Sequence, residues 1–193
     1  MDYPDGATPL DPDEMNGIKF PHITTRGQLD QMEHVNIQEG LRWLNRIQHT
    51  NMLTDQFVRK LHEKLFGNVW GWAGSFRQTE KNIGIDPVQI SQQLRVLLDD
   101  AQYWIENETY PPYELALRLH HRMVFIHPFP NGNGRHARIM ADAVLMQLLA
   151  KKSIDWKGDS LNSDSKIRDD YITALRRADQ GDYGPLLALY SND

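Results

Sequence analysis

Apolar residues recur every three or four positions along most of the chain, which is the spacing of an amphipathic helix. Short segments rich in glycine, proline and asparagine separate these stretches, and such residues favour turns. The pattern predicts helices over 25–49, 55–66, 87–104, 112–126, 134–149, 165–178 and 183–190. The stretch 134–149 is apolar almost all round, so we expect it to be a central, buried helix.

Capping residues mark several of the predicted helix starts. Gln28 follows Thr25 by three residues, which is a capping-box pattern. Thr54 precedes the second helix as an N-cap residue. Asp86 and Pro87 form a cap and a first helical position, because proline is well tolerated where no backbone N–H is needed.

Two segments do not have a helical pattern. Residues 75–86 are too short and too broken for a helix, and they predict a small β-hairpin with strands at 75–79 and 83–85. Residues 1–22 show little periodicity, so we expect an acidic extended arm or a mobile tail. The rest, 23–193, predicts one mostly α-helical bundle with a single projecting hairpin.

The composition excludes several kinds of site. The 193 residues include no cysteine, which excludes disulfides, thiolate zinc sites, iron–sulfur clusters and cysteine nucleophiles. No apolar run approaches the roughly 18 residues that a membrane span requires. The chain begins with acidic residues, whereas a signal peptide begins with basic ones. We therefore expect a cytoplasmic protein.

The net charge of −5 comes from the beginning of the chain. The first basic residue is Lys19, and the acidic residues before it are Asp2, Asp5, Asp11, Asp13 and Glu14. From Lys19 onward the chain has equal numbers of acidic and basic side chains. Such a neutral surface does not favour broad contact with nucleic acid or anionic lipid. Any anion that the protein binds must therefore be held at a local site.

The segment 127–138, with the sequence HPFPNGNGRHAR, carries the residues best suited to chemistry. Pro128 stops the preceding helix, and the following glycines and asparagines form a loop that leads directly into the next helix. Such a loop directs backbone N–H groups at one point, where the helix dipole also favours an anion. Arg135 and Arg138 lie three residues apart on the first turn and suit a polyphosphate.

His127 stands next to this anion site with a side chain that can accept a proton near neutral pH. The residues alone suggest phosphoryl or nucleotidyl transfer to a hydroxyl that His127 activates. A simpler interpretation stays open, because similar patterns occur at solvated helix ends and Arg138 can pair with Asp142. His120 and His121 are adjacent on a helix and point apart, so they do not predict a zinc site.

The segment 127–138 resembles the signature of the Fic (Fic/Doc) family, His-Pro-Phe-x-Asp/Glu-Gly-Asn-Gly-Arg-x-x-Arg. The segment WAGSFR resembles the start of that family's target-binding flap, here about 75–86. The whole chain is similar to the subfamily called mobile mystery protein B, whose members are typically encoded beside a helix-turn-helix partner, mobile mystery protein A. The resemblance implies an all-α Fic fold and a target protein as partner.

The resemblance also implies an activity, the transfer of AMP from ATP to a Ser, Thr or Tyr hydroxyl of a target protein. His127 would deprotonate that hydroxyl, and Phe129 would pack beneath the loop. In the flap, backbone groups of Gln78, Thr79 and Glu80 would pair with the target as an added strand.

The nucleotide would be bound by the rest of the signature, together with Mg²⁺. Gly132, Asn133 and Gly134 would form an anion hole, and Asn133 would also touch the transferred phosphate. Arg135 and Arg138 would hold the β- and γ-phosphates.

Asn131 departs from the family pattern, because the family has an acidic residue there that helps to hold Mg²⁺. An amide oxygen can bind Mg²⁺ weakly but adds no negative charge. Three outcomes stay open: slower turnover with Mg²⁺ held mainly by the nucleotide, another Fic transfer such as phosphorylation or use of a different nucleotide, or a regulatory module that binds nucleotide without turnover.

A second departure concerns regulation. Many Fic proteins have an inhibitory helix reading Ser/Thr-x-x-x-Glu-Gly/Asn, whose glutamate pairs with the second signature arginine. Residues 35–40, VNIQEG, contain Glu39 and Gly40 but lack the hydroxyl residue. Glu39 is therefore either an inhibitory residue or an ordinary solvated charge.

Overall fold

Helices make up most of the described chain, which confirms the predicted fold class. The computed structural model describes residues 11–20, 22–23, 25–47, 50–157 and 165–190. Its helices are α1 (Pro12–Met15), α2 (Arg26–Leu44), α3 (Asp55–Phe66), α4 (Ile90–Glu106), α5 (Pro112–Ile126), α6 (Asn133–Gln147), α8 (Ser165–Ala178) and α9 (Gly184–Tyr190), with a 3₁₀ turn, η1 (Pro87–Gln89), before α4. Among these described helices, none combines the length and the apolar character needed to cross a membrane.

The predicted capping residues begin the helices that they precede. The side chains and backbones of Thr25 and Gln28 bond each other reciprocally, at 3.3 Å and 3.2 Å, to form the capping box of α2. The hydroxyl of Thr54 accepts from the backbone N–H of Phe57 at 3.2 Å at the start of α3. These contacts join near neighbours in the chain, which is why the sequence pattern predicts them.

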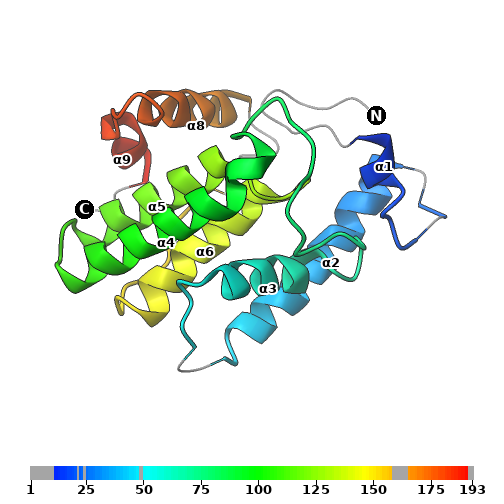
Figure 1. Ribbon diagram of the computed structural model, residues 1–193, viewed down its shortest axis with the longest axis horizontal. Helices are drawn as coiled ribbons and strands as arrows, with labels where there is room; N and C mark the ends of the chain where they lie inside the picture. Colours follow the sequence, from blue (N-terminus) through cyan, green and yellow to red (C-terminus); the bar gives the residue numbers. More distant parts are fainter. Residues whose placement is uncertain (1–10, 21, 24, 48–49, 158–164, 191–193) are drawn as a thin grey trace.

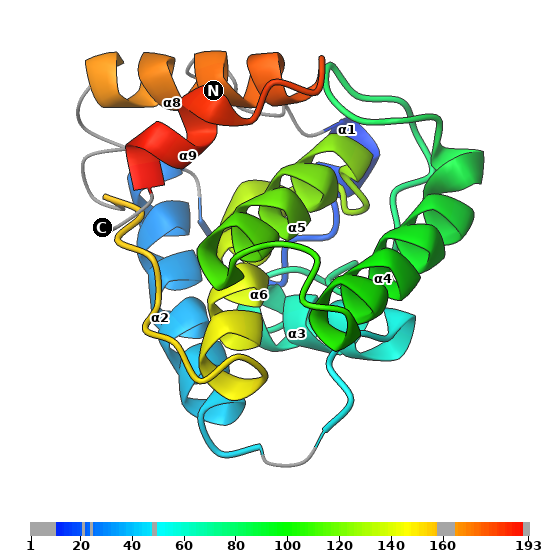
Figure 2. The same ribbon diagram turned by 90° about the vertical axis from the view of Figure 1, so that its left-hand side faces the viewer.

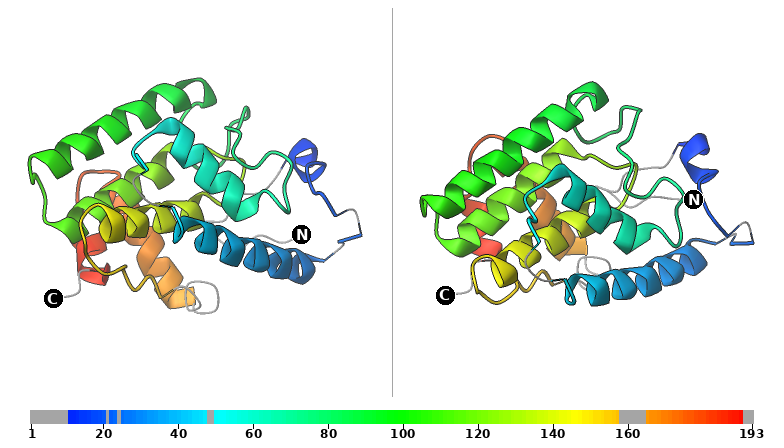
Figure 3. Two further views of the ribbon diagram at one scale, coloured as in Figure 1. Left: turned by 90° about the horizontal axis from the view of Figure 1, so that it is seen from below. Right: turned by 60° about the horizontal axis from the view of Figure 1, so that its bottom comes forward.

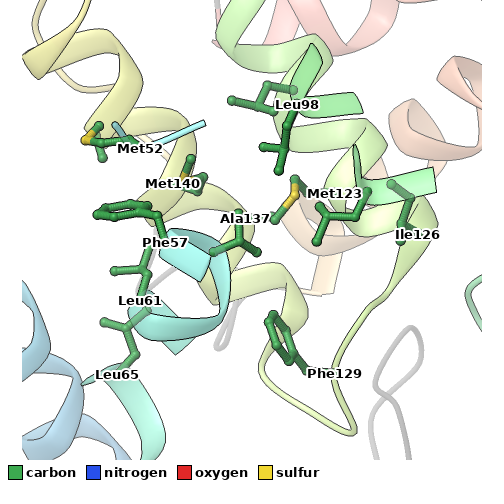
Figure 4. Packing of buried hydrophobic residues seen from close by; sticks show 14 of the residues in the cluster. Met52, Phe57, Leu61, Leu65, Leu98, Met123, Ile126, Phe129, Ala137 and Met140 are labelled. Carbon is green, nitrogen blue, oxygen red and sulfur yellow. The ribbon is translucent and has the colours of Figure 1, made fainter. Parts of the chain in front are cut away.

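The helices α5 and α6 form the centre of the molecule. They pack against each other, with α2 and α3 on one side and α8 and α9 on the other (Figure 1). Figure 2 shows α4 running alongside α5. Figure 4 shows Phe57 and Leu61 of α3 on one side of Met140 of α6 and Met123 of α5 on the other. The prediction of a central, buried helix over 134–149 is thus confirmed.

A second hydrophobic cluster joins α8 and α9 to the central pair. Its buried members come from α5, α6, α8, α9 and the segment after α6: Ala116, Leu117, Ala141, Leu145, Ile154, Trp156, Tyr171, Ala174, Leu175, Leu186 and Tyr190. Apolar side chains therefore cover the central helices from two sides, and the loop that joins α5 to α6 lies at one end of this packed pair.

Residues 75–86 form a loop, and the predicted β-hairpin is wrong. No strand is present within this segment, all of which the structure describes. The physical reason is Arg77, whose side chain is only 1% exposed. Its guanidinium donates hydrogen bonds to the carbonyl oxygens of Thr79 and Ile85, on the two halves of the segment. A buried cation therefore joins the two halves where strand pairing was expected.

Residues 11–20 pack against the helical body, which differs from the extended arm that the sequence predicts. Ile18 forms an isolated antiparallel bridge with Trp70. The ammonium of Lys81, on the loop after α3, lies 2.7 Å from the carboxylate of Asp11. Figure 3 shows α1 at the same end of the molecule as that loop. The earlier part of the predicted arm lies outside the described residues.

Candidate active site

The loop between α5 and α6 contains two residues in the left-handed conformation. His127 ends α5 with φ 53° and ψ 60°, and Gly132 precedes α6 with φ 79°. A Cβ atom at Gly132 would lie 2.7 Å from Cζ of Phe66, so the backbone conformation and the lack of space both require glycine. Because glycine has no capping side chain, backbone N–H groups of the first turn of α6 can serve an anion.

Asn133 closes this loop. Its Oδ1 accepts from the backbone N–H of Phe129 at 2.9 Å, and its Nδ2 donates to the carbonyl of Phe129 at 2.7 Å. The ring of Phe129 lies beneath the loop (Figure 4) and stacks on His62 with the ring centroids 3.7 Å apart. The Asn133 amide therefore shapes the turn, and its contact with phosphate stays a prediction.

His127 is held as a neutral imidazole. Its Nδ1 lies 3.3 Å from the carbonyl oxygen of Val124. A carbonyl can only accept, so Nδ1 carries the hydrogen and Nε2 carries the lone pair. Burial lowers the pKa of His127 to about 4, so the ring is uncharged at neutral pH. This protonation state is the one in which a histidine acts as a general base.

Arg77 supports His127, a contact that the sequence pattern does not predict. Its Nε donates to the carbonyl oxygen of His127 at 2.6 Å, and its backbone N–H donates to the carbonyl of Pro128 at 2.9 Å. Gly84, on the same loop, approaches so closely that a Cβ atom there would lie 2.6 Å from Cβ of His127. The loop 75–86 therefore lies against the histidine. No sequence signal distinguishes such an arginine from a solvated charge in a polar loop.

Arg135 is paired with a carboxylate from α2. Its Nη1 lies 2.6 Å from Oε2 of Glu33, and the guanidinium carbon lies 4.9 Å from the ring centroid of Phe66. The other carboxylate oxygen of Glu33 accepts from Nε1 of Trp70 at 2.6 Å. Glu33 is only 5% exposed, whereas the side chain of Arg135 is 35% exposed, so the ion pair is shielded from water on the Glu33 side.

The sequence analysis also missed Glu33, although a signal was present. The buried positions of α2 are spaced by three or four residues and form one face of the helix: Leu29, Glu33, Asn36, Gly40 and Leu44. A carboxylate at a position that the periodicity places inside the molecule requires a buried partner. That requirement is the signal that identifies Glu33.

Arg138 has a neutral partner. Its guanidinium lies beside Tyr171 on α8, with the guanidinium carbon 6.0 Å from the ring centroid. Asp142, the alternative partner that the sequence offered, instead accepts from the backbone N–H of Ile154 and from Nε1 of Trp156, both at 2.9 Å. The two arginines at the start of α6 are therefore held by helices on opposite sides of the central pair.

Comparison with known proteins agrees with this arrangement. Residues 52–145 match the model of the Fic/DOC family. Over that range the chain is similar to a Fic/DOC domain. The matched range includes α3, α4, α5 and the loop with its two arginines, so the geometry described above is that of the Fic signature.

The chain is also similar to relatives that are named protein adenylyltransferases. It is 27% identical over 165 residues to protein adenylyltransferase Fic of Nematostella vectensis, covering 82% of this chain and 37% of that protein. It is 28% identical over 144 residues to protein adenylyltransferase fic-1 of Caenorhabditis elegans, covering 68% of this chain and 27% of that protein. The chain thus spans about a third of the length of these relatives.

Solved Fic structures share the fold. A fragment of Fic-1 from C. elegans has a TM-score of 0.68 at 23% identity, covering 90% of this chain and 50% of that one. The N-terminal Fic domain of a VirB-translocated Bep effector from Bartonella quintana, a structure with bound ADP, has a TM-score of 0.68 at 17% identity and covers 92% of this chain and 93% of that one.

Asn131 departs from the acidic residue of the Fic signature, and the structure gives it other partners. Its side-chain oxygen accepts from Nη2 of Arg135 at 3.3 Å, and its carbonyl oxygen lies 3.0 Å from Nε2 of His62. Within the described residues, no group of three or more His, Cys, Asp or Glu side chains is placed to hold a metal ion. Asn131 itself would offer Mg²⁺ a neutral amide oxygen.

Glu39 lies away from the Fic signature arginines. Its carboxylate accepts from Nδ2 of Asn68 at 2.6 Å at an exposed position, and the carboxylate on a signature arginine is that of Glu33. Gly40 has a packing role, because a Cβ atom there would lie 2.8 Å from Cδ2 of Leu65 where α3 crosses α2. Close packing of α2 against α3 therefore explains Gly40, the residue that suggested an inhibitory role for Glu39.

The residues predicted to face the target lie on the loop beside His127. Gln78, Thr79 and Glu80 are all exposed. The hydroxyl of Thr79 donates to Asp11 at 2.8 Å, so the segment before α2 covers part of this loop. Their predicted pairing with a target stays a prediction, because the loop itself forms no strand.

Proposed function

We propose that this chain is a protein adenylyltransferase that transfers AMP from ATP to a hydroxyl side chain of a target protein. One observation carries the proposal: the neutral His127 and the amino terminus of α6, with its two arginines, flank the same loop. This arrangement supplies a base, an anion site and cations for a polyphosphate. The names of the relatives support the choice of AMP as the transferred group.

The proposed reaction is a displacement at the α-phosphorus of ATP. The hydroxyl oxygen of the target forms a bond to the α-phosphorus, and the bond from that phosphorus to the α–β bridging oxygen breaks. Nε2 of His127 accepts the hydroxyl proton, and pyrophosphate leaves. Backbone N–H groups at the start of α6 offset the charge on the transferred phosphate, while Arg135 and Arg138 bind the β- and γ-phosphates.

Mg²⁺ would be bound mainly through the phosphates of ATP. It would offset phosphate charge, as it does in other phosphate-transfer reactions. The chain's own contribution is small, because Asn131 supplies a neutral oxygen that already accepts a hydrogen bond from Arg135. Turnover is therefore expected to be slower than in a Fic enzyme with an acidic residue at this position.

Glu33 is proposed to take the inhibitory role that the sequence analysis considered for Glu39. A phosphate that binds Arg135 must displace a carboxylate held at 2.6 Å. The pairing differs from the family pattern, in which the inhibitory glutamate contacts the second arginine. Here it contacts the first, and Arg138 is left to its neutral partner.

The partner is proposed to be a target protein whose extended segment docks on the loop containing Gln78, Thr79 and Glu80. Membership of the mobile mystery protein B subfamily, with a helix-turn-helix partner, is a further proposal supported by the resemblance of the whole chain. The target itself must be found by labelling.

Labelling with α-labelled and γ-labelled ATP tests the function. Label on protein from the α position alone, absent in His127→Ala, is the expected result. Label from the γ position alone would identify phosphorylation instead. Nucleotide binding without label from either position would identify a regulatory module. That result is expected if Glu33 stays paired with Arg135 and keeps the phosphates from binding there.

A further inference from the structure

Tyr171 lies where α8 packs against the central helices, and it is only 6% exposed. Its hydroxyl has two polar neighbours, Nε2 of His120 at 3.0 Å and the guanidinium of Arg138. His120 comes from α5 and Arg138 from α6. One buried oxygen therefore connects α8 to both helices that flank the signature loop.

The direction of these hydrogen bonds follows from the chemistry of the three groups. The guanidinium carbon of Arg138 lies 6.0 Å from the ring centroid of Tyr171, and because a guanidinium can only donate, the Tyr171 oxygen faces it as an acceptor. The hydroxyl hydrogen is then available to Nε2 of His120. Burial lowers the pKa of His120 well below its usual value, so the imidazole is neutral and can accept. The hydrogen bond between His120 and Tyr171 therefore needs no negative charge, and Nδ1 of His120 is left without a hydrogen-bond partner among the described residues.

The absence of charge matters for a phosphate-binding arginine. A carboxylate partner would orient Arg138 but would also compete with phosphate for it. A hydroxyl orients the guanidinium and leaves its positive charge available. Nη1 of Arg138 also lies close to the amino terminus of α6, 3.9 Å from where a Cβ atom of Gly134 would be. The oriented cation is thus beside the turn that would bind the phosphate chain.

We propose that Tyr171 is the positioning residue of Arg138 and that, with His120 behind it, it directs the guanidinium toward the outer phosphates of the bound nucleotide. This inference rests on the proposed function. A free arginine side chain loses rotamer entropy when it binds a ligand, and holding it in place beforehand reduces that loss. Tyr171 therefore acts on nucleotide affinity through Arg138 and touches no substrate.

The test is nucleotide binding by the full chain with Tyr171→Phe, measured with ATP, ADP and AMP. The substitution should weaken ATP and ADP binding by about tenfold, the effect of one hydrogen bond to a charged group. AMP binding should stay unchanged, because AMP has no outer phosphate. A general loss of stability would weaken all three equally. The matched control is Tyr190→Phe, which removes a hydroxyl from the same hydrophobic cluster and should leave all three affinities unchanged.

A double-variant cycle tests whether Tyr171 acts through Arg138. In an Arg138→Ala background, Tyr171→Phe should cause no further loss of ATP affinity. Should Tyr171→Phe fail to fold, His120→Phe provides the second test, with a smaller loss confined to ATP and ADP.

Several outcomes would overturn the inference. These are equal losses for all three nucleotides, the same affinities in Tyr171→Phe and Tyr190→Phe, or a full additional loss in the Arg138→Ala background. A different result, no binding of any nucleotide by the unsubstituted chain or by Glu33→Gln, would overturn the proposed function itself. The two failures are therefore distinguishable.

Discussion

The two arginines of the signature differ in what holds them. Arg135 is paired with a buried carboxylate, Glu33 on α2, at 2.6 Å. Arg138 lies beside a neutral side chain, Tyr171 on α8, with its guanidinium carbon 6.0 Å from the ring centroid. The arginines are three residues apart on one helix, so their environments are set by the flanking helices. A charged partner competes with phosphate for the arginine, whereas a neutral partner only orients it.

This difference assigns different roles to the two sides of the site. The side of α2 can regulate binding, because an incoming phosphate must displace Glu33 from Arg135. The side of α8 can prepare binding, because Tyr171 keeps Arg138 in place without neutralising it. Figure 1 shows α2 and α8 on opposite sides of the central pair. A change in the position of either helix would alter one arginine and leave the other unchanged.

The largest expected effect is that of removing Arg138. Arg138→Ala should weaken ATP binding by about 100-fold, because it removes charge-assisted hydrogen bonds from an arginine that forms no salt bridge within the described residues. Arg135→Ala should cost less, about tenfold, because its phosphate contact replaces an existing ion pair. Isothermal titration with ATP measures both. Arg177→Ala, which removes an exposed pair with Asp182, is the control, and equal losses for Arg135 and Arg138 would contradict the comparison.

Removing the carboxylate of Glu33, the partner of Arg135, should strengthen ATP binding. Glu33→Gln keeps an oxygen for the Nε1 of Trp70 but removes the negative charge. ATP affinity and self-labelling should rise by about tenfold, since phosphate no longer competes with a carboxylate. Glu39→Gln is the matched control, because that carboxylate contacts Asn68 at the surface. If ATP affinity and self-labelling rose with Glu39→Gln and did not rise with Glu33→Gln, Glu39 would be the inhibitory residue.

Local patterns explain which features the sequence could predict. Thr25 and Thr54 cap their helices through backbone groups three residues away, so the pattern and the contact lie in the same short segment. The loop at 127–138 is likewise continuous in the chain, and its glycines, arginines and histidine could all be read directly. The helices, their caps and the signature were therefore predictable.

The missed features all join residues that are distant in the chain. Glu33 and Arg135 are 102 residues apart, and Arg77 and His127 are 50 residues apart. Which partner a buried charge meets depends on which helices pack together, and no local pattern contains that information. The hairpin at 75–86 was predicted wrongly for the same reason, since the burial of Arg77 replaces strand pairing.

Asn131→Asp should have a moderate effect on the Arg135 side. The new carboxylate would lie beside Nη2 of Arg135, where the amide oxygen is now 3.3 Å away. It would also offer Mg²⁺ a charged oxygen. The transfer rate should rise several-fold and depend more steeply on Mg²⁺ concentration. A rate that is unchanged at every Mg²⁺ concentration would show that the nucleotide alone determines metal binding.

The smallest expected effect is a proton linkage on the Arg138 side. Burial raises the pKa of Asp142 to about 6, and the nearby Arg138 opposes that rise. When phosphate occupies Arg138, added negative charge should raise the pKa of Asp142 further, so ATP binding near pH 6 should take up protons. The corresponding loss of affinity above pH 6 should be less than about threefold. Titration calorimetry in buffers of different ionisation enthalpy measures the uptake. Asp142→Asn should remove the proton uptake that comes from Asp142, while the uptake that comes from ATP itself stays the same. Identical proton uptake by the unsubstituted chain and by Asp142→Asn would mean that Arg138 does not bind the phosphates.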